Sequence, residues 1–321
     1  MPPSDYIQRV AIVGATGHVG THFTQELVKT GKHTVTALVR KGSTGTIASG
    51  ATRTEVDFEN QDSLVAALAG QQFLVITLSA RAPSETHASI IKAAAKAGVS
   101  YVMPNVYGGD FRNEEMMKED LYSAGALERC NDVANSGMSY VAMVCGFWYE
   151  WSLALGSIAF GIDIKTKKAI FYDDGQRRLP VSTWPLCGQA LAKLLSLPES
   201  GAEPSLEQWK NGMLCFASFH VNQREMLDSV HRVLGDSDAD WEIQYESSKE
   251  RYEKGLADMA NGDHTGFARA LYARPFYPNG GGDFKADLKL NNEILGLPEE
   301  KLDDATRTAV DMVQSGWQPF P

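Results

Sequence analysis

Short apolar runs alternate with segments of helical periodicity through the first half of the chain. Residues 10–13 are uncharged and largely β-branched, and Phe23, Leu27 and Val28 then recur at helical spacing before Gly31. The same alternation continues to about residue 147. It predicts strands at 10–13, 33–40, 52–58, 73–79, 100–109 and 139–147, with helices at 20–31, 62–70, 85–98 and 125–137. We expect Asp62 or Ser63 to cap the second helix.

Alternating strands and helices indicate a doubly wound α/β fold. Such an order produces a parallel sheet with helices on both faces. The pattern is lost after residue 163, where short strands and helices mix. We therefore predict a dinucleotide-binding domain of the Rossmann type at 1–162 and a smaller α+β substrate lobe at 163–321, leaving open an exchange of segments between them.

Three glycines follow the first strand at intervals of three residues. They are Gly14, Gly17 and Gly20, and they separate the apolar run from the first helix. Glycines at a strand-to-helix turn let backbone N–H groups approach a pyrophosphate, which the helix N-terminus attracts. An ordinary structural turn is the alternative. The spacing favours a dinucleotide loop, in which Thr16, His18 and Val19 are the remaining candidate contacts.

The residues after the second strand bear on the choice of cofactor. Arg40 and Lys41 stand where a carboxylate would favour NAD and a basic group the 2′-phosphate of NADP. A solvated basic pair is the alternative, but the glycine loop makes NADPH the preferred cofactor. By their position at the ends of later strands, further candidate cofactor contacts are Asp57, Phe58, Thr77, Ser79 and Asn105.

Composition narrows the class of protein. The 321 residues have a formal net charge of −10, which argues against a general nucleic-acid surface. The first ten residues hold no apolar signal core, and residues 140–162 are better explained as a strand entering a pocket wall than as a membrane span. We expect a cytoplasmic protein with no metal site, and with buried free thiols at Cys130, Cys145, Cys187 and Cys215.

Several segments resemble the NmrA-like and isoflavone-reductase-like group of atypical short-chain dehydrogenases/reductases, in a fungal branch. They are "VAIVGATGHVG", the pair Arg40–Lys41, "SYVMPNVYGGD", "HVNQREMLDSVHRVLG", and the tail segments "YPNGGGDF" and "NNEILGLPEEKLDDATRTAVDMV". The resemblance covers most of the chain. It implies a Rossmann domain, a C-terminal substrate lobe and NADPH. The group contains reductases of aromatic substrates and also regulators that bind dinucleotide without turnover.

The chain departs from this group at the expected proton-handling lysine. Aligned on "ANSGMSYV", the position falls on Ala126. The Tyr-x-x-x-Lys pattern at Tyr245 and Lys249 is better explained as a solvated helix face. Three nearby residues remain as catalytic candidates, with surface or packing roles as alternatives: Tyr107, Lys118 and Tyr122.

Aromatic residues gather after the sixth strand, where this fold opens onto its ligand crevice. Phe147, Trp148 and Trp151, with Tyr107, are candidate contacts for a flat substrate, and plain core packing is the alternative. The sequence therefore predicts an NADPH-dependent reductase of a small, largely apolar or aromatic substrate. A dinucleotide-sensing regulator is the second hypothesis, and the oligomeric state is left open.

Overall fold

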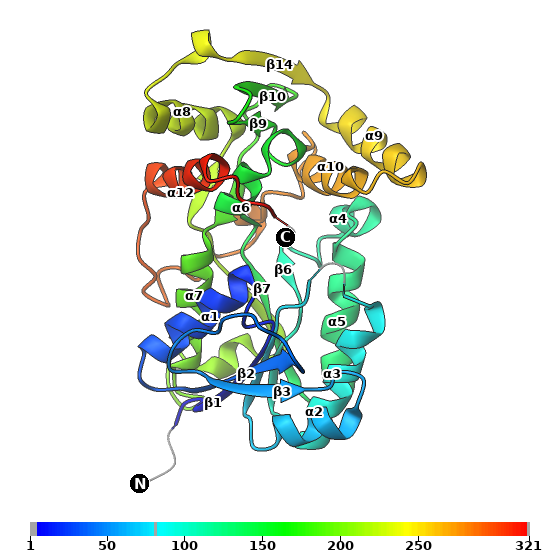
Figure 1. The fold of residues 1–321 in the computed structure, drawn as a ribbon, viewed down its shortest axis with the longest axis vertical. Coiled ribbons are helices and arrows are strands. Elements are labelled where there is room, and N and C mark those ends of the chain that lie inside the picture. Colours follow the sequence, from blue (N-terminus) through cyan, green and yellow to red (C-terminus); the bar gives the residue numbers. More distant parts are fainter. Residues whose placement is uncertain (1–4, 80–81, 320–321) are drawn as a thin grey trace.

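The central feature of the molecule is a parallel sheet flanked by helices. The computed structural model describes residues 5–79 and 82–319. The main strands run in the order β12-β7-β5-β4-β1-β2-β3, all parallel, and β6 also pairs with β7 (Figure 1). They are β1 (Arg9–Val13), β2 (Thr34–Arg40), β3 (Thr52–Val56), β4 (Phe73–Ile76), β5 (Tyr101–Met103), β6 (Tyr107–Gly108), β7 (Ser139–Val144) and β12 (Gly212–Cys215). The predicted doubly wound fold is confirmed.

Helices cover both faces because successive strand side chains point to opposite sides. Val10 and Ile12 of β1 pack toward α1 and α7, whereas Ala11 and Val13 pack toward α2 and α3. All four residues are buried, so β1 is apolar on both faces after the exposed Arg9 at its start. The helices of this part are α1 (His18–Lys29), α2 (Gln61–Leu68), α3 (Ser84–Ala97), α4 (Glu114–Glu119), α5 (Ser123–Asn135) and α7 (Trp184–Leu195).

A second lobe sits at one end of the sheet and is built on two small mixed sheets (Figure 1). Strand order is β14-β10-β9 in one and β13-β11-β8 in the other. Helix α12 packs on α6 and α8 beside them. The strands are β8 (Phe147–Trp148), β9 (Ile162–Asp163), β10 (Lys168–Tyr172), β11 (Leu179–Ser182), β13 (Phe219–Val221) and β14 (Glu242–Glu246). The helices are α6 (Tyr149–Ala154), α8 (Gln223–Leu234), α9 (Ser248–Ala260), α10 (Thr265–Ala273), α11 (Phe284–Asp287) and α12 (Leu302–Gln314), with 3₁₀ turns at Gly156–Ile158, Leu206–Trp209, Asp238–Asp240 and Arg274–Phe276.

The chain crosses between the two parts more than once. Strand β12 extends the main sheet beside β7, and α7 packs against α1, although both follow residue 162 in sequence. Segments that follow residue 162 thus contribute a strand to the main sheet and a helix to the layer that covers it. The division at residue 162 itself stays a prediction.

Two local expectations are wrong. Asn60, not Asp62 or Ser63, caps α2, because its side chain accepts hydrogen bonds from the backbone N–H groups of both residues. Tyr245 lies on β14 and only Lys249 on α9, so the Tyr-x-x-x-Lys residues do not share a helix face.

The long apolar stretch at 140–162 is divided among β7, β8, α6 and β9. Among the helices of the described residues, none has the length and apolarity needed to cross a bilayer.

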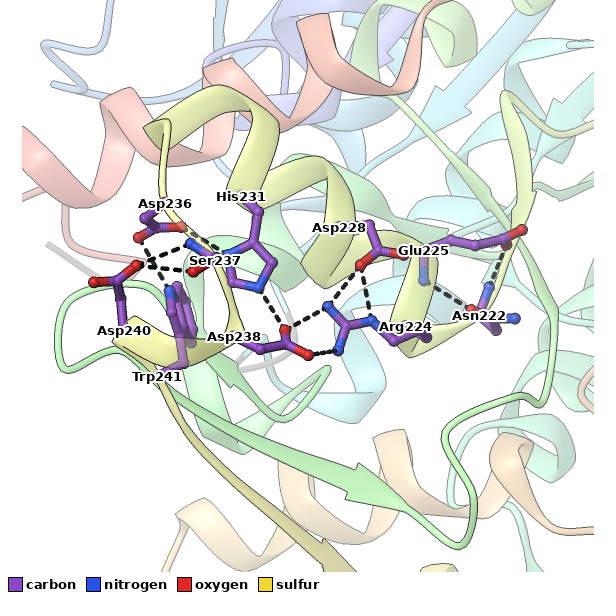
Figure 2. A network of polar contacts seen from close by, with 10 residues as sticks. All are labelled: Asn222, Arg224, Glu225, Asp228, His231, Asp236, Ser237, Asp238, Asp240 and Trp241. Atoms are coloured by element: carbon purple, nitrogen blue, oxygen red, sulfur yellow. Dashed lines mark hydrogen bonds and ion pairs between the residues drawn. The ribbon is translucent and has the colours of Figure 1, made fainter.

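A polar network holds the outer part of the lobe together (Figure 2). Arg224 of α8 bonds Asp228 one turn on and Asp238 after the helix. Asp238 also accepts from His231, whose other ring nitrogen meets Asp236. The guanidinium of Arg224 holds the pKa of Asp238 below its ordinary value. The network fastens α8 to the turn before β14, and we assign it a structural role.

Candidate dinucleotide and substrate site

The glycine loop is shaped by its contact with β4. A Cβ at Gly14 would lie 2.1 Å from the carbonyl oxygen of Thr77, and φ at Gly14 is +82°. A Cβ at Gly20 would lie 2.2 Å from the carbonyl oxygen of Gly14. The Thr77 hydroxyl donates to the carbonyls of Val13 at 2.9 Å and Gly14 at 3.1 Å. Gly14, Gly20 and Thr77 are therefore needed to pack the loop, whatever binds to it.

Gly17 has a different environment. A Cβ there would meet only the Gly14 carbonyl oxygen, at 3.2 Å, so the side facing away from the loop is open. Gly17 is also the N-cap of α1, and it supplies no side-chain hydrogen bond to the first turn. Asn60 and Asn222 cap α2 and α8, whereas α3, α5 and α12 begin, like α1, without a side-chain cap. The first-turn N–H groups of α1 thus lack a side-chain cap, which fits an anionic group held by the backbone.

The basic pair lies at the carboxyl end of β2, as the sequence predicts. Arg40 and Lys41 are exposed, and within the described residues neither side chain forms a hydrogen bond or an ion pair. The loop that follows is held by Arg53 of β3, whose guanidinium donates to the carbonyls of Ser43 and Gly45. Arg40 ends β2 and Lys41 begins the loop that Arg53 braces, and this loop approaches Thr16 of the glycine turn at Gly45.

The other predicted cofactor residues differ in what they do. Thr16 is exposed on the loop, and a Cβ at Gly45 would lie 3.0 Å from its side chain. Val19 is buried in the core, and Phe58 packs on the opposite face of the sheet. The side chain of Asp57 accepts from the backbone of Glu59.

Ser79 and Asn105 lie where β4 and β5 end. Ser79 is exposed and lies just after β4. The amide of Asn105 accepts from Leu78 N–H at 3.0 Å and donates to the Leu78 carbonyl at 3.3 Å. Asn105 thereby links the segments that follow β4 and β5, and these segments carry Ser79 and Tyr107.

Of the three catalytic candidates, the structure brings Tyr107 and Tyr122 together. The Tyr107 N–H donates to the Tyr122 hydroxyl, and the Tyr107 hydroxyl donates to the Ile76 carbonyl at 2.8 Å. Burial raises the pKa of both phenols above the ordinary value. Lys118 lies on α4 with its side chain 66% exposed and pairs with Glu115 at 3.2 Å.

An aromatic wall runs from Tyr107 to the first residue of α1. Ring centroids of Tyr107 and Trp148 are 6.2 Å apart, and those of Trp148 and Trp184 are 6.5 Å apart. His18 stacks on Trp184 at 4.9 Å with planes 5° apart, and it also meets Trp151 at 5.2 Å. The indole N–H groups of Trp148 and Trp184 are buried and have no acceptor among the described residues. Phe147 lies apart from this wall and stacks on Tyr272 in the core of the lobe.

Glu150 connects the two helices that carry the wall. It lies at the start of α6, and its Oε1 accepts a hydrogen bond from the backbone N–H of Trp184, the first residue of α7, at 2.9 Å. Its Oε2 is buried without a partner among the described residues, beside a cavity of about 330 Å³ that Thr183 and Glu300 also line. Burial raises the pKa of Glu150 to about 7, and Glu300 adds to the effect.

Sequence reasoning missed Arg53, Glu150, Trp184 and Trp317 as parts of this region. Each lies far from the glycine loop in sequence, and no local motif marks it.

All four cysteines are free and buried, as predicted. Among the described residues, no three His, Cys, Asp or Glu side chains are grouped to hold a metal ion.

Glu150→Gln should change how stability depends on pH. When folding raises the pKa of a carboxyl, the folded protein loses stability as the pH rises between the two pKa values. For Glu150 these are about 4.3 in the unfolded chain and about 7 in the folded chain. Glutamine keeps the acceptor for Trp184 and does not ionise. We expect the variant to match the parent near pH 4.5 and to exceed its unfolding free energy at pH 8, by roughly 3 kcal/mol.

Urea unfolding at the two pH values measures this difference. Glu299→Gln is the control, because Glu299 lines the same cavity but is exposed. A Glu150→Gln variant that is weaker than the parent by the same amount at both pH values would contradict the ionisation argument.

Comparison with known proteins places this geometry among dinucleotide-binding proteins. Residues 14–151 match the NAD(P)H-binding family. The chain is 25% identical over 301 residues to "Oxidoreductase aprR" of Aspergillus flavus, covering 92% of this chain and 96% of that protein. It is 26% identical over 313 residues to "Oxidoreductase poxI" of Penicillium oxalicum, covering 93% and 92%.

Solved structures share the whole architecture. An isoflavone reductase superposes with a TM-score of 0.73 at 19% identity, over 94% of this chain and 98% of that chain. AtPrR2 with NADP⁺ and (+)-pinoresinol gives 0.73 at 18% identity over the same shares. The NADPH complex of quinone oxidoreductase QOR2 from Escherichia coli gives 0.68 at 20% identity, over 92% and 98%. Residues 14–151 thus match the NAD(P)H-binding family, and the chain shares its fold with an isoflavone reductase and with AtPrR2.

Proposed function

We propose that this protein is an NADPH-dependent reductase of a small, largely apolar or aromatic substrate. The observation that carries the proposal is the position of the aromatic wall, which reaches the uncapped first turn of α1 at His18. A dinucleotide held at that turn would therefore have aromatic side chains beside it. The relatives named as oxidoreductases and the NADP-bound neighbours support the same class of activity.

Different residues of this chain bind different parts of the proposed cofactor. The first-turn N–H groups of α1 hold the pyrophosphate, and Gly17 leaves room for it. Arg40 and Lys41, which are unpaired and exposed within the described residues, hold the 2′-phosphate. NADPH supplies a hydride when bound, and a proton must come from the protein or from water to complete the reduction.

Trp148 is the side chain that we propose contacts the substrate most specifically. Its buried indole N–H lacks an acceptor among the described residues, and a buried donor without a partner is unfavourable. A substrate oxygen placed against the wall would satisfy it. We therefore propose a flat substrate whose oxygen acceptor meets the N–H edge of the Trp148 indole and whose ring stacks against Trp151.

Tyr107 is the proton donor that we propose. It lies against Trp148, and its hydroxyl is at the end of β4, where the parallel strands open onto the crevice. The phenol is protonated at neutral pH, but its raised pKa makes it a weaker acid than a free tyrosine. The role therefore requires the positive charge that develops on the nicotinamide to favour proton transfer. Lys118 and Tyr122 remain the comparison residues, one exposed and the other bonded to the Tyr107 backbone.

A turnover assay separates this proposal from the second hypothesis. NADPH oxidation would be followed with quinones, dienones and aryl ketones. A chain that binds NADPH and reduces none of these compounds would support the dinucleotide-sensing regulator.

Gly17→Ala should weaken NADP⁺ binding while the fold remains. The added methyl meets one backbone oxygen at 3.2 Å in the protein, but it enters the space that we assign to the pyrophosphate. We expect a loss of at least about tenfold in affinity by calorimetry. Gly212→Ala is the matched control, because its Cβ also meets a single backbone oxygen tightly, at 3.3 Å, on β12. Gly14→Val is less informative, since it clashes with Thr77 before any ligand binds. Unchanged affinity in Gly17→Ala would place the cofactor elsewhere.

The double change of Arg40 and Lys41 to Ala should weaken NADPH and leave NADH nearly unchanged. A charge-assisted contact to phosphate contributes about 1.5–3 kcal/mol, roughly ten- to a hundredfold in affinity. Binding of both cofactors is measured in parallel by calorimetry. The double change of Lys165 and Lys167, exposed in the lobe, to Ala is the charge-matched control. Equal losses for NADPH and NADH would refute the assignment.

Tyr107→Phe should lower turnover by about 10²-fold with NADPH affinity intact, the usual size of a general-acid contribution. The variant keeps the ring against Trp148 and removes only the hydroxyl. Steady-state rates on a confirmed substrate test it, with Lys118→Met and Tyr122→Phe assayed beside it. If either of these variants loses more turnover than Tyr107→Phe does, the role of proton donor belongs to that residue.

A further inference from the structure

The C-terminal segment returns from the lobe to the glycine loop. Helix α12 ends at Gln314, and Gly316, with φ of +72°, turns the chain back. The Trp317 N–H then donates to the Met312 carbonyl at 3.0 Å, which fixes the direction of the turn. In Figure 1 the red terminal segment leaves α12 and runs past α6. Trp317 is therefore placed by a helix end and not by a free tail.

The indole of Trp317 meets two rings that belong to the candidate site. It lies edge-on to Trp151 at 5.1 Å and to His18 at 5.7 Å between ring centroids. His18 is the first residue of α1 and follows Gly17 directly. Because Trp184 stacks on His18 as well, the imidazole is held by tryptophans from α7, α6 and the C-terminal segment together.

Core packing does not account for Trp317. The buried residues of α12 are Ala305, Thr306, Ala309 and Val310, and the helix packs on α6 and α8. Trp317 itself is only half-buried. A large aromatic ring that stays partly open beside an uncapped helix N-terminus has a face available to a ligand.

We propose that Trp317, with His18 and Trp151, forms the wall that closes the nicotinamide end of the dinucleotide site. This inference rests on the proposed function, since it needs NADP(H) at the glycine loop. The adenosine end is held at Arg40 and Lys41, at the carboxyl end of β2. Trp317 therefore acts on one half of the cofactor, and the two halves can be measured separately.

The test compares two probes on the full chain by calorimetry. NADP⁺ carries the nicotinamide, whereas adenosine 2′,5′-bisphosphate carries only the adenosine end and its phosphates. Trp317→Ala should weaken NADP⁺ binding about three- to tenfold, the size of a lost aromatic contact, and leave the bisphosphate unchanged. Trp317→Phe should recover most of the loss. Phe267→Ala, an aromatic truncation at a 39% exposed position of α10, should change neither affinity.

The coupling between Trp317 and His18 gives a second readout. The effects of Trp317→Ala and His18→Ala on NADP⁺ affinity should be non-additive, because the two rings are in contact. Equal weakening of both probes, unchanged NADP⁺ affinity, or tighter NADP⁺ binding in Trp317→Ala would overturn the inference. The inference is also overturned if the parent chain binds the bisphosphate and no variant changes the affinity for NADP⁺ relative to the bisphosphate. A parent chain that binds neither probe overturns the proposed function.

Discussion

The close approach of the glycine loop to β4 is the constraint on which the site depends. At Gly14 and Gly20 no side chain fits, because the Thr77 and Gly14 carbonyls occupy the space of a Cβ. The Thr77 hydroxyl reinforces the contact by donating to two carbonyls of the loop. This packing brings the N-terminus of α1 against the carboxyl ends of β1 and β4, where the strand order reverses. The same contact leaves Gly17 open, so the space beside the first turn of α1 results from the packing of the glycine loop.

The join between sheet and lobe is the second determinant. Glu150 bonds the start of α7 from the start of α6, and so it fixes Trp184 relative to Trp151. Both rings then reach His18, which α1 presents from the sheet side. A buried carboxyl with a pKa near 7 makes this joint sensitive to pH. The aromatic wall consequently belongs to neither part alone.

Local patterns were sufficient for the parallel core. The β-branched run at 10–13, the helical spacing of Phe23 and Leu27, and the glycine spacing each depend on neighbours within a few residues. They predicted β1, α1 and the parallel doubly wound sheet that the structure confirms. The cap of α2 was misassigned by two or three residues, because Asn60, Asp62 and Ser63 are all good caps and only backbone geometry chooses among them.

The sequence by itself determined the fold class, the glycine loop and the basic pair, since each is a short-range pattern with a direct physical meaning. Only the tertiary structure decided which glycine is open to a ligand, that Lys118 faces solvent, and that Tyr107 bonds the end of β4. It alone brought Trp317 to His18, nearly three hundred positions away in the chain. Such contacts arise where α6, α7 and α12 converge, and their relative placement depends on the packing of the whole lobe, which no local periodicity encodes.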